Sequence, residues 1–383
     1  MAQTDVVPPV TPLASPAAVR WPRALLLVVT LAIALGIGFG IGGEGGRFAT
    51  TGSVYAPLIL LAILLQFRDR TAARVLSWLW FWCIVLATAV FAVGITALQL
   101  APSAGTPTAA QGRLLLGPVL AVLLIVLVAM LVAATPAWAA LGRWLGGRPD
   151  RRQPAHVQGT VGVLVVSALG STPLVFLNGH APVVDLVNRM EAGALSLGFV
   201  EQLLSQMYTV FWTVILVLVG AAWPARTSIR GAMARLGLGR LSKRDVLPLA
   251  AVTLFAVGLG LGLDVFSRSV LASLDLPVTD ASVIARLIPA ATTPLGAITV
   301  AVCAGVSEEL LFRGLLQPRL GWLLANLGFA AAHAFQYGLD GLVVVFALGA
   351  IQAFVRQRWN TSAAIGVHAS YDAVTLLLNS LGF

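Results

Sequence analysis

Two adjacent carboxylates and an arginine interrupt an apolar run in the last third of the chain. The run begins near Leu295 and carries no other charge before Glu308 and Glu309. On a helix Glu309 and Arg313 share one face as an ion pair, with the acid on the N-terminal side. Adjacent residues point about 100° apart, so Glu308 faces elsewhere and is free to act as a general base. Charged side chains inside a membrane are rare and usually functional, so the stretch predicts a buried polar site.

Two histidines lie in the apolar runs that follow. His333 comes one helical turn after Phe329, which can pack against its imidazole. His368 comes one turn before Asp372, which can accept a hydrogen bond from the ring and fix its orientation. A carboxylate base, a neutral histidine and an oriented second histidine are suitable parts for activating water against a peptide carbonyl. Asn326, in the same run as His333, predicts an interhelical hydrogen bond beside this site.

A structural role explains each of these residues when it is taken alone. Glu309 with Arg313 is a common structural ion pair, and Phe329 and Asn326 are ordinary packing and bonding residues of membrane helices. A single histidine in a membrane is a satisfied packing residue about as often as a functional one. Their joint occurrence in the last helices is much harder to explain by packing, because the groups can give one another partners that lipid cannot supply.

Composition sets the environment in which these residues must be held. The 383 residues are 58% hydrophobic and only 10% charged. A soluble protein usually has about a quarter of its residues charged, so a multi-pass membrane protein is predicted. The formal net charge of +9 comes from Lys and Arg in short loops. We attribute that charge to membrane topology and expect no nucleic-acid partner. The two cysteines, Cys83 and Cys303, lack metal-ligand spacing and predict small buried hydrophobes.

Eleven apolar runs predict membrane spans, the second and tenth of them short. The runs are residues 24–42, 53–67, 75–99, 114–136, 157–178, 203–223, 246–266, 294–312, 320–336, 341–355 and 361–381. When the loops are alternated, most Lys and Arg residues fall on the side of the N-terminus, which is therefore predicted to be cytoplasmic. The predicted fold is an all-α transmembrane bundle. Residues 1–22 are predicted to form a disordered cytoplasmic tail. Residues 23–240 are predicted to form accessory transmembrane helices and a basic cytoplasmic loop.

The predicted spans leave one geometric conflict. Glu308 falls at the cytoplasmic end of the run 294–312, whereas a straight helix over 320–336 puts His333 near the opposite membrane face. For the two side chains to meet, the span boundaries must shift, or a helix must be tilted, broken or re-entrant. Hydropathy fixes the ends of a span less sharply than spacing fixes the motifs, so a shared site for Glu308 and His333 is still predicted.

Together these motifs resemble those of the CPBP family of intramembrane proteases, also called the CAAX-protease and bacteriocin-processing or Abi family. The family pattern is two glutamates, three residues and arginine; then Phe, three residues and His; then His, three residues and Asn or Asp. In this chain the matching residues are Glu308, Glu309, Arg313, Phe329, His333, His368 and Asp372. The motifs lie within residues 289–378, and residues 241–383 are expected to form a CPBP-like catalytic core.

The resemblance implies an endopeptidase with a polar cavity inside a helical bundle. The family's eukaryotic members remove the last three residues of prenylated CAAX proteins. If the family's residue roles hold at the matching positions, Glu308 with His333 would activate water, and His368 with residue 372 would stabilise the oxyanion. Glu309 and Arg313 would shape the site. The CAAX-cleaving members have Asn where this chain has Asp372, and an ionised Asp cannot donate to an oxyanion. We therefore expect Asp372 to orient His368, or else to be protonated.

No cofactor is expected, because a metal-free glutamate mechanism uses the same residues. The alternative is a zinc-dependent version of the same protease, with Glu308, His333 and His368 as ligands. Two further alternatives remain: a non-catalytic membrane scaffold, and a proton-coupled transporter that relays protons through intramembrane Glu and His. Expected partners are membrane lipids and a peptide or membrane-protein substrate, with lipidated substrates included. The expected location is the cell membrane, with the site open to the cytoplasm.

Overall fold

The computed structural model describes residues 20–100, 180–181, 183–184, 187–188, 198–280, 282–334 and 336–380. In these residues the regular elements are helices, as the composition predicts. The predicted spans 114–136 and 157–178, and the predicted tail apart from residues 20–22, lie outside the described residues. The remaining predicted spans each coincide with a helix.

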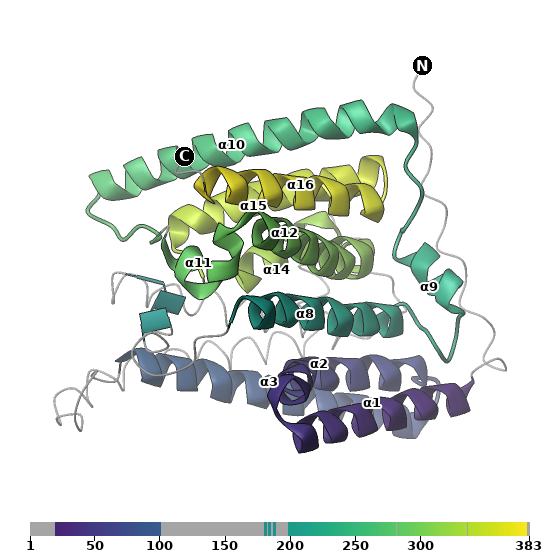
Figure 1. The fold of residues 1–383 in the computed structure, drawn as a ribbon. Coiled ribbons are helices and arrows are strands. Elements are labelled where there is room, and N and C mark those ends of the chain that lie inside the picture. The colour runs from purple at the N-terminus through teal and green to yellow at the C-terminus, as the bar shows by residue number, and fades with distance from the viewer. Residues whose placement is uncertain are drawn as a thin grey trace.

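The first helices form a layer of their own (Figure 1). They are α1 (Trp21–Ile41), α2 (Gly43–Gln66) and α3 (Thr71–Leu100). The turn from α1 to α2 uses Gly42 and Gly43, whose φ angles of 70° and 52° favour glycine. Helix α8 (Phe199–Gly220) packs against α2 on one side and against α12 (Pro294–Glu309) on the other. It therefore joins the N-terminal layer to the C-terminal bundle that contains the predicted site.

The C-terminal bundle holds the site helices beneath a long covering helix (Figure 1). After α9 (Ile229–Arg235) and the short turn η2 (Lys243–Asp245), α10 (Val246–Ser273) lies across α15 and α16. Next come α11, η3, α12, η4, α13, α14, α15 and α16. Their bounds are Ser282–Leu287, Pro289–Thr292, Pro294–Glu309, Leu310–Leu316, Gln317–Leu320, Trp322–Ala332, Leu339–Arg358 and Thr361–Ser380. Helix α12 packs most extensively on α16, which brings the acid pair to the second histidine motif.

Six helices of the described residues are long and apolar enough to cross a membrane. They are Trp21–Ile41, Gly43–Gln66, Phe199–Gly220, Lys243–Ser273, Pro294–Leu320 and Leu339–Arg358. Helix α14 differs from its predicted span because it has only 11 residues. Its rise of about 17 Å is roughly half the thickness of a hydrocarbon core. The total of eleven spans and the cytoplasmic N-terminus stay predictions.

The short α14 resolves the conflict between Glu308 and His333. The helix that carries Glu308 does not end there but continues through the π-helical segment η4 and α13 to Leu320. Glu308 therefore lies near the middle of its span, and the predicted position at the cytoplasmic end was wrong. At Gly321 (φ 82°) the chain reverses into α14. Because Glu308 and His333 are nearly equally far from this turn along the chain, the two side chains come to the same depth.

Candidate active site

The site forms where α12, η4, α14 and α16 meet. Each predicted site residue lies on one of these elements, except His333, which directly follows α14. The residues are Glu308, Glu309, Arg313, Asn326, Phe329, His333, His368 and Asp372. The structure brings them together through one antiparallel hairpin and one packed helix pair.

Glu308 faces both histidines. Its Oε2 lies 3.7 Å from Nε2 of His333 and 3.9 Å from Nε2 of His368. These separations are too long for direct hydrogen bonds, and a bridging water suits polar contacts of this length. The Oε2 atom is buried and makes no hydrogen bond with the described part of the chain. The side chain as a whole is 28% exposed, so one oxygen of a partly accessible carboxylate points at two imidazoles.

Glu309 has two partners and not the single one that its spacing predicted. Its Oε2 lies 3.3 Å from Nε of Arg313, and both side chains are fully buried, which confirms the ion pair. Its Oε1 lies 2.8 Å from Nδ1 of His368. A carboxylate can only accept, so Nδ1 carries the proton in this hydrogen bond. Oδ2 of Asp372, which the sequence predicted as the partner that orients His368, lies 3.3 Å from the opposite nitrogen, Nε2. Glu309 is a second partner of the ring, which the sequence did not predict.

Arg313 is enclosed by the remaining predicted residues. Its Nη2 donates to Oδ1 of Asn326 at 3.2 Å, and its guanidinium carbon lies 4.9 Å from the centre of the Phe329 ring. Asn326 in turn donates through Nδ2 to the carbonyl of Phe346 on α15, at 2.8 Å. Asn326 therefore makes the predicted interhelical hydrogen bond and also holds Arg313. The π-helical turn around Arg313 is a feature often found at functional sites.

His333 is held in one tautomer by its own helix. Its Nδ1 lies 2.9 Å from the carbonyl oxygen of Phe329. Because a carbonyl only accepts, Nδ1 donates and Nε2 is left as the acceptor that faces Glu308. The Phe329 ring packs against the imidazole with centroids 4.8 Å apart, as predicted. On the other side Tyr337 stacks on His333 at 6.1 Å and 13° between planes. Sequence reasoning missed Tyr337, although its spacing of one helical turn after His333 was a usable signal.

Gly349 on α15 is required by the close packing around Arg313. A Cβ atom there would lie 2.0 Å from Oδ1 of Asn326, 2.8 Å from the Phe329 ring and 3.0 Å from Nη2 of Arg313. We expect Gly349→Ala to lower the free energy of unfolding by about 1–3 kcal/mol through overpacking. Denaturant titration of the purified protein measures this. Gly366→Ala on α16 is the matched control, since nothing lies within 4 Å of its Cβ position, and it is expected to be neutral or stabilising. Equal losses in both variants would contradict the packing described.

Comparison with protein families gives one match. Residues 290–374 match the family described as type II CAAX prenyl endopeptidase, Rce1-like. The match is under a quarter of the chain but contains every predicted site residue. Searches of curated proteins and of solved structures found no match. The donor types of Glu308, His333 and His368 suit zinc, but no three His, Cys, Asp or Glu side chains among the described residues form a ready ligand set.

Proposed function

We propose that the chain is an intramembrane endopeptidase in which Glu308 activates water, because residues 290–374 match the family described as type II CAAX prenyl endopeptidase, Rce1-like. The observation that carries the proposal is the convergence of Nε2 of His333 and Nε2 of His368 on Oε2 of Glu308, at 3.7 and 3.9 Å. A carboxylate between two imidazoles, at distances that one water can bridge, suits general-base hydrolysis of a peptide bond.

In the proposed first step a water molecule donates one hydrogen to Oε2 of Glu308 and the other to Nε2 of His333. Both atoms are acceptors, because Nδ1 of His333 already donates to the Phe329 carbonyl. The water oxygen then directs its lone pair at the carbonyl carbon of the substrate. As the new C–O bond forms, the water proton that is hydrogen-bonded to Oε2 of Glu308 passes to that carboxylate.

His368 is the proposed donor to the oxyanion. With Glu309 accepting from Nδ1 at 2.8 Å, a doubly protonated ring presents its second N–H through Nε2. Asp372, 3.3 Å from Nε2, is well placed to support this charged form. When the C–N bond breaks, Glu308 returns its proton to the leaving amine. The products are a carboxylic acid and an amine, and the enzyme is unchanged.

The family supports a substrate peptide held at the membrane, and lipidated CAAX-type peptides are the first class to test. The chain is a multi-pass membrane protein. The α9 segment lies at the same end of the bundle as the end of α15, since the backbone N–H of Thr361 donates to the carbonyl of Gly237 at 3.0 Å. Arg235 lies in the last turn of α9, and Arg356 and Arg358 lie in the last turn of α15. Their charge supports a cytoplasmic position for this end of the bundle, and we propose that the site opens towards that side.

Purified protein in detergent, given a farnesylated CAAX-type peptide and its unfarnesylated twin, tests the proposed activity. We expect a new C-terminus by mass spectrometry, and activity that survives dialysis against a metal chelator, since Glu308 and His333 place the water without a metal. Faster cleavage of the farnesylated peptide would assign lipidated substrates. Stoichiometric zinc whose removal abolishes activity, and whose return restores it, would contradict the metal-free mechanism and assign Glu308, His333 and His368 as ligands.

A further inference from the structure

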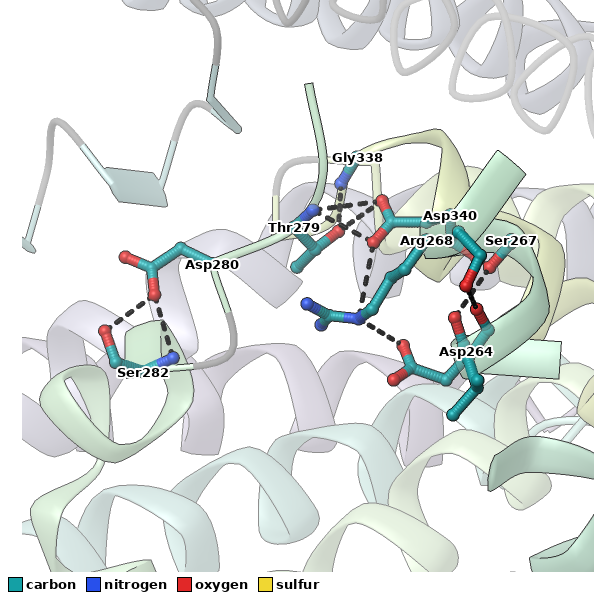
Figure 2. Close-up of polar contacts among 10 residues, drawn as sticks. Asp264, Ser267, Arg268, Thr279, Asp280, Ser282, Gly338 and Asp340 are labelled. Atoms are coloured by element: carbon teal, nitrogen blue, oxygen red, sulfur yellow. Dashed lines mark hydrogen bonds and ion pairs between the residues drawn. The ribbon is translucent and has the colours of Figure 1, made fainter. Parts of the chain in front are cut away.

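A buried carboxylate outside the site binds two loops together (Figure 2). Asp340, in the first turn of α15, is fully buried. Its Oδ1 and Oδ2 accept from the backbone N–H of Thr279 at 3.1 and 2.9 Å, and Oδ1 also accepts from the Thr279 hydroxyl at 2.7 Å. Nε of Arg268 lies 3.9 Å from Oδ2. A buried carboxylate is costly unless it is hydrogen-bonded or paired, and Asp340 has such partners in Thr279 and Arg268. The stability of Asp340 in the core therefore depends on the position of Thr279.

Thr279 lies in the segment between α10 and α11, and the next residue, Asp280, makes its hydrogen bonds at the α11 end of that segment. Asp280 accepts from the backbone and hydroxyl of Ser282, at 2.9 and 2.7 Å, at the start of α11 (Figure 2). These hydrogen bonds lower the pKa of Asp280, with Arg286 contributing in the same direction. Asp280 is therefore engaged in the loop itself, whereas Thr279 reaches Asp340.

The same hydroxyl continues to the segment that follows His333. The backbone N–H of Gly338 donates to Oγ1 of Thr279 at 2.9 Å. One residue earlier, the N–H of Tyr337 donates to the carbonyl of His333 at 3.1 Å, and the Tyr337 ring stacks on the His333 ring. A continuous series of contacts thus runs from Asp340 through Thr279 and Gly338 to the histidine that faces Glu308.

The first turn of α15 leaves Tyr337 little room to move. A Cβ atom at Gly341 would lie 2.7 Å from Cβ of Tyr337 and 2.9 Å from Cγ. Tyr337 therefore packs directly on the helix that Asp340 anchors. Two independent features, the hydrogen bonds of Thr279 and this close packing, fix the same short segment.

We propose that Asp340 and Thr279 are positioning residues that hold Tyr337 and Gly338, and through them direct the His333 imidazole at Glu308. The inference rests on the proposed function, in which His333 acts beside Glu308. It assigns no chemistry to Asp340 itself. Because α14 ends just before His333, the helix alone does not fix the residues that follow, and the hydrogen bonds to Thr279 supply that constraint.

The test compares Thr279→Val with Thr279→Ser. Valine keeps the shape but loses the hydroxyl that links Asp340 to Gly338, whereas serine keeps it. We expect Thr279→Val to lower kcat per folded molecule about ten- to hundredfold with little change in KM, because small misplacements of a catalytic group cost factors of this size. Thr279→Ser is expected to restore most of the rate. If Thr279→Val does not fold, Asp340→Asn, which keeps one acceptor oxygen, is expected to give a smaller loss.

A second measurement reports on the surroundings of His333 and does not depend on peptide cleavage. Modification of each histidine by diethyl pyrocarbonate is followed by mass spectrometry, with His368 as the internal reference. We expect Thr279→Val to change the rate at His333 severalfold and to leave His368 unchanged. The matched control is Thr361→Val at the start of α16, which loses another buried hydroxyl bond, to the carbonyl of Leu236 at 2.6 Å, and makes no contact with Thr279 or Asp340 that the structure records. That variant is expected to lose stability without changing kcat or the labelling of His333.

The outcomes separate the two proposals. If the wild-type protein shows no cleavage that depends on Glu308, the proposed function fails, and the labelling of His333 alone decides whether Thr279 positions it. If the wild-type protein cleaves peptide and Thr279→Val keeps both the wild-type kcat and the wild-type labelling, the positioning role is overturned. Equal losses of kcat in Thr279→Val and Thr361→Val would overturn it as well.

Discussion

Replacing Glu308 by Gln is expected to lower kcat for peptide cleavage by about 10²–10⁴-fold, the usual contribution of a general base. The amide has nearly the shape of the carboxyl group but cannot take a proton from water. Its folding cost should be small, because Oε2 of Glu308 makes no hydrogen bond in the described part of the chain. Steady-state cleavage and thermal unfolding, measured on the same detergent-purified samples, separate the loss of chemistry from a loss of folded protein.

Two controls sharpen this result. Glu308→Asp keeps a carboxylate but withdraws it by one methylene from His333, so partial activity is expected. Glu201→Gln alters a carboxylate that pairs with Arg47 at 2.7 Å, away from the site, and should retain the full rate. A Glu308→Gln variant with wild-type kcat would remove Glu308 from the mechanism. If that variant also kept its biological activity in cells, the scaffold alternative would gain support.

Glu309→Leu is expected to reduce the free energy of unfolding by about 3–5 kcal/mol, because it leaves Arg313 buried without its counter-charge. Both side chains are fully buried, with Nε of Arg313 3.3 Å from Oε2 of Glu309. The same change removes the acceptor that holds Nδ1 of His368, so activity should be lost as well. Denaturant titration measures the first effect, and cleavage per folded molecule measures the second.

The double variant Glu309→Leu with Arg313→Met separates these two effects. Replacing both members of a buried ion pair by apolar residues is often neutral or stabilising, so much of the lost stability should return. Activity should not return, because His368 still lacks its partner. A double variant that recovers both stability and cleavage would show that Glu309 only balances Arg313. A fully stable Glu309→Leu single variant would contradict the buried ion pair itself.

Helical periodicity accounted for much of this fold. The apolar runs predicted the helices of the described residues, and the spacing of one turn correctly paired Glu309 with Arg313 and Phe329 with His333. These are local relations, so an isolated sequence contains them. The predicted site residues also converge in space, since buried polar groups in lipid must find one another. Their catalytic roles stay proposals.

Long-range relations were harder to predict. Glu309 bonds His368 across 59 positions of the chain, and no spacing rule predicts that contact. Helix α14 was taken as a full span because its apolar run continues past His333, whereas the helix ends at Ala332. Asp340 sits just outside the predicted span 341–355, and no motif in the sequence distinguishes it. Only the fold shows that Asp340 is fully buried and accepts a hydrogen bond from Thr279.

A single-turnover cleavage in water labelled with heavy oxygen tests the central claim most directly. Enzyme in excess over peptide is mixed in labelled water, and the new C-terminal carboxyl group and Glu308 are analysed by mass spectrometry. If Glu308 activates water, each product carboxyl gains one labelled oxygen in the first turnover and Glu308 gains none. Glu308→Gln forms no product in the time that the wild-type protein needs for that turnover. Label in Glu308 with an unlabelled product would show that the carboxylate attacks the substrate itself. Labelled product formed by Glu308→Gln at the wild-type rate would exclude Glu308 as the base.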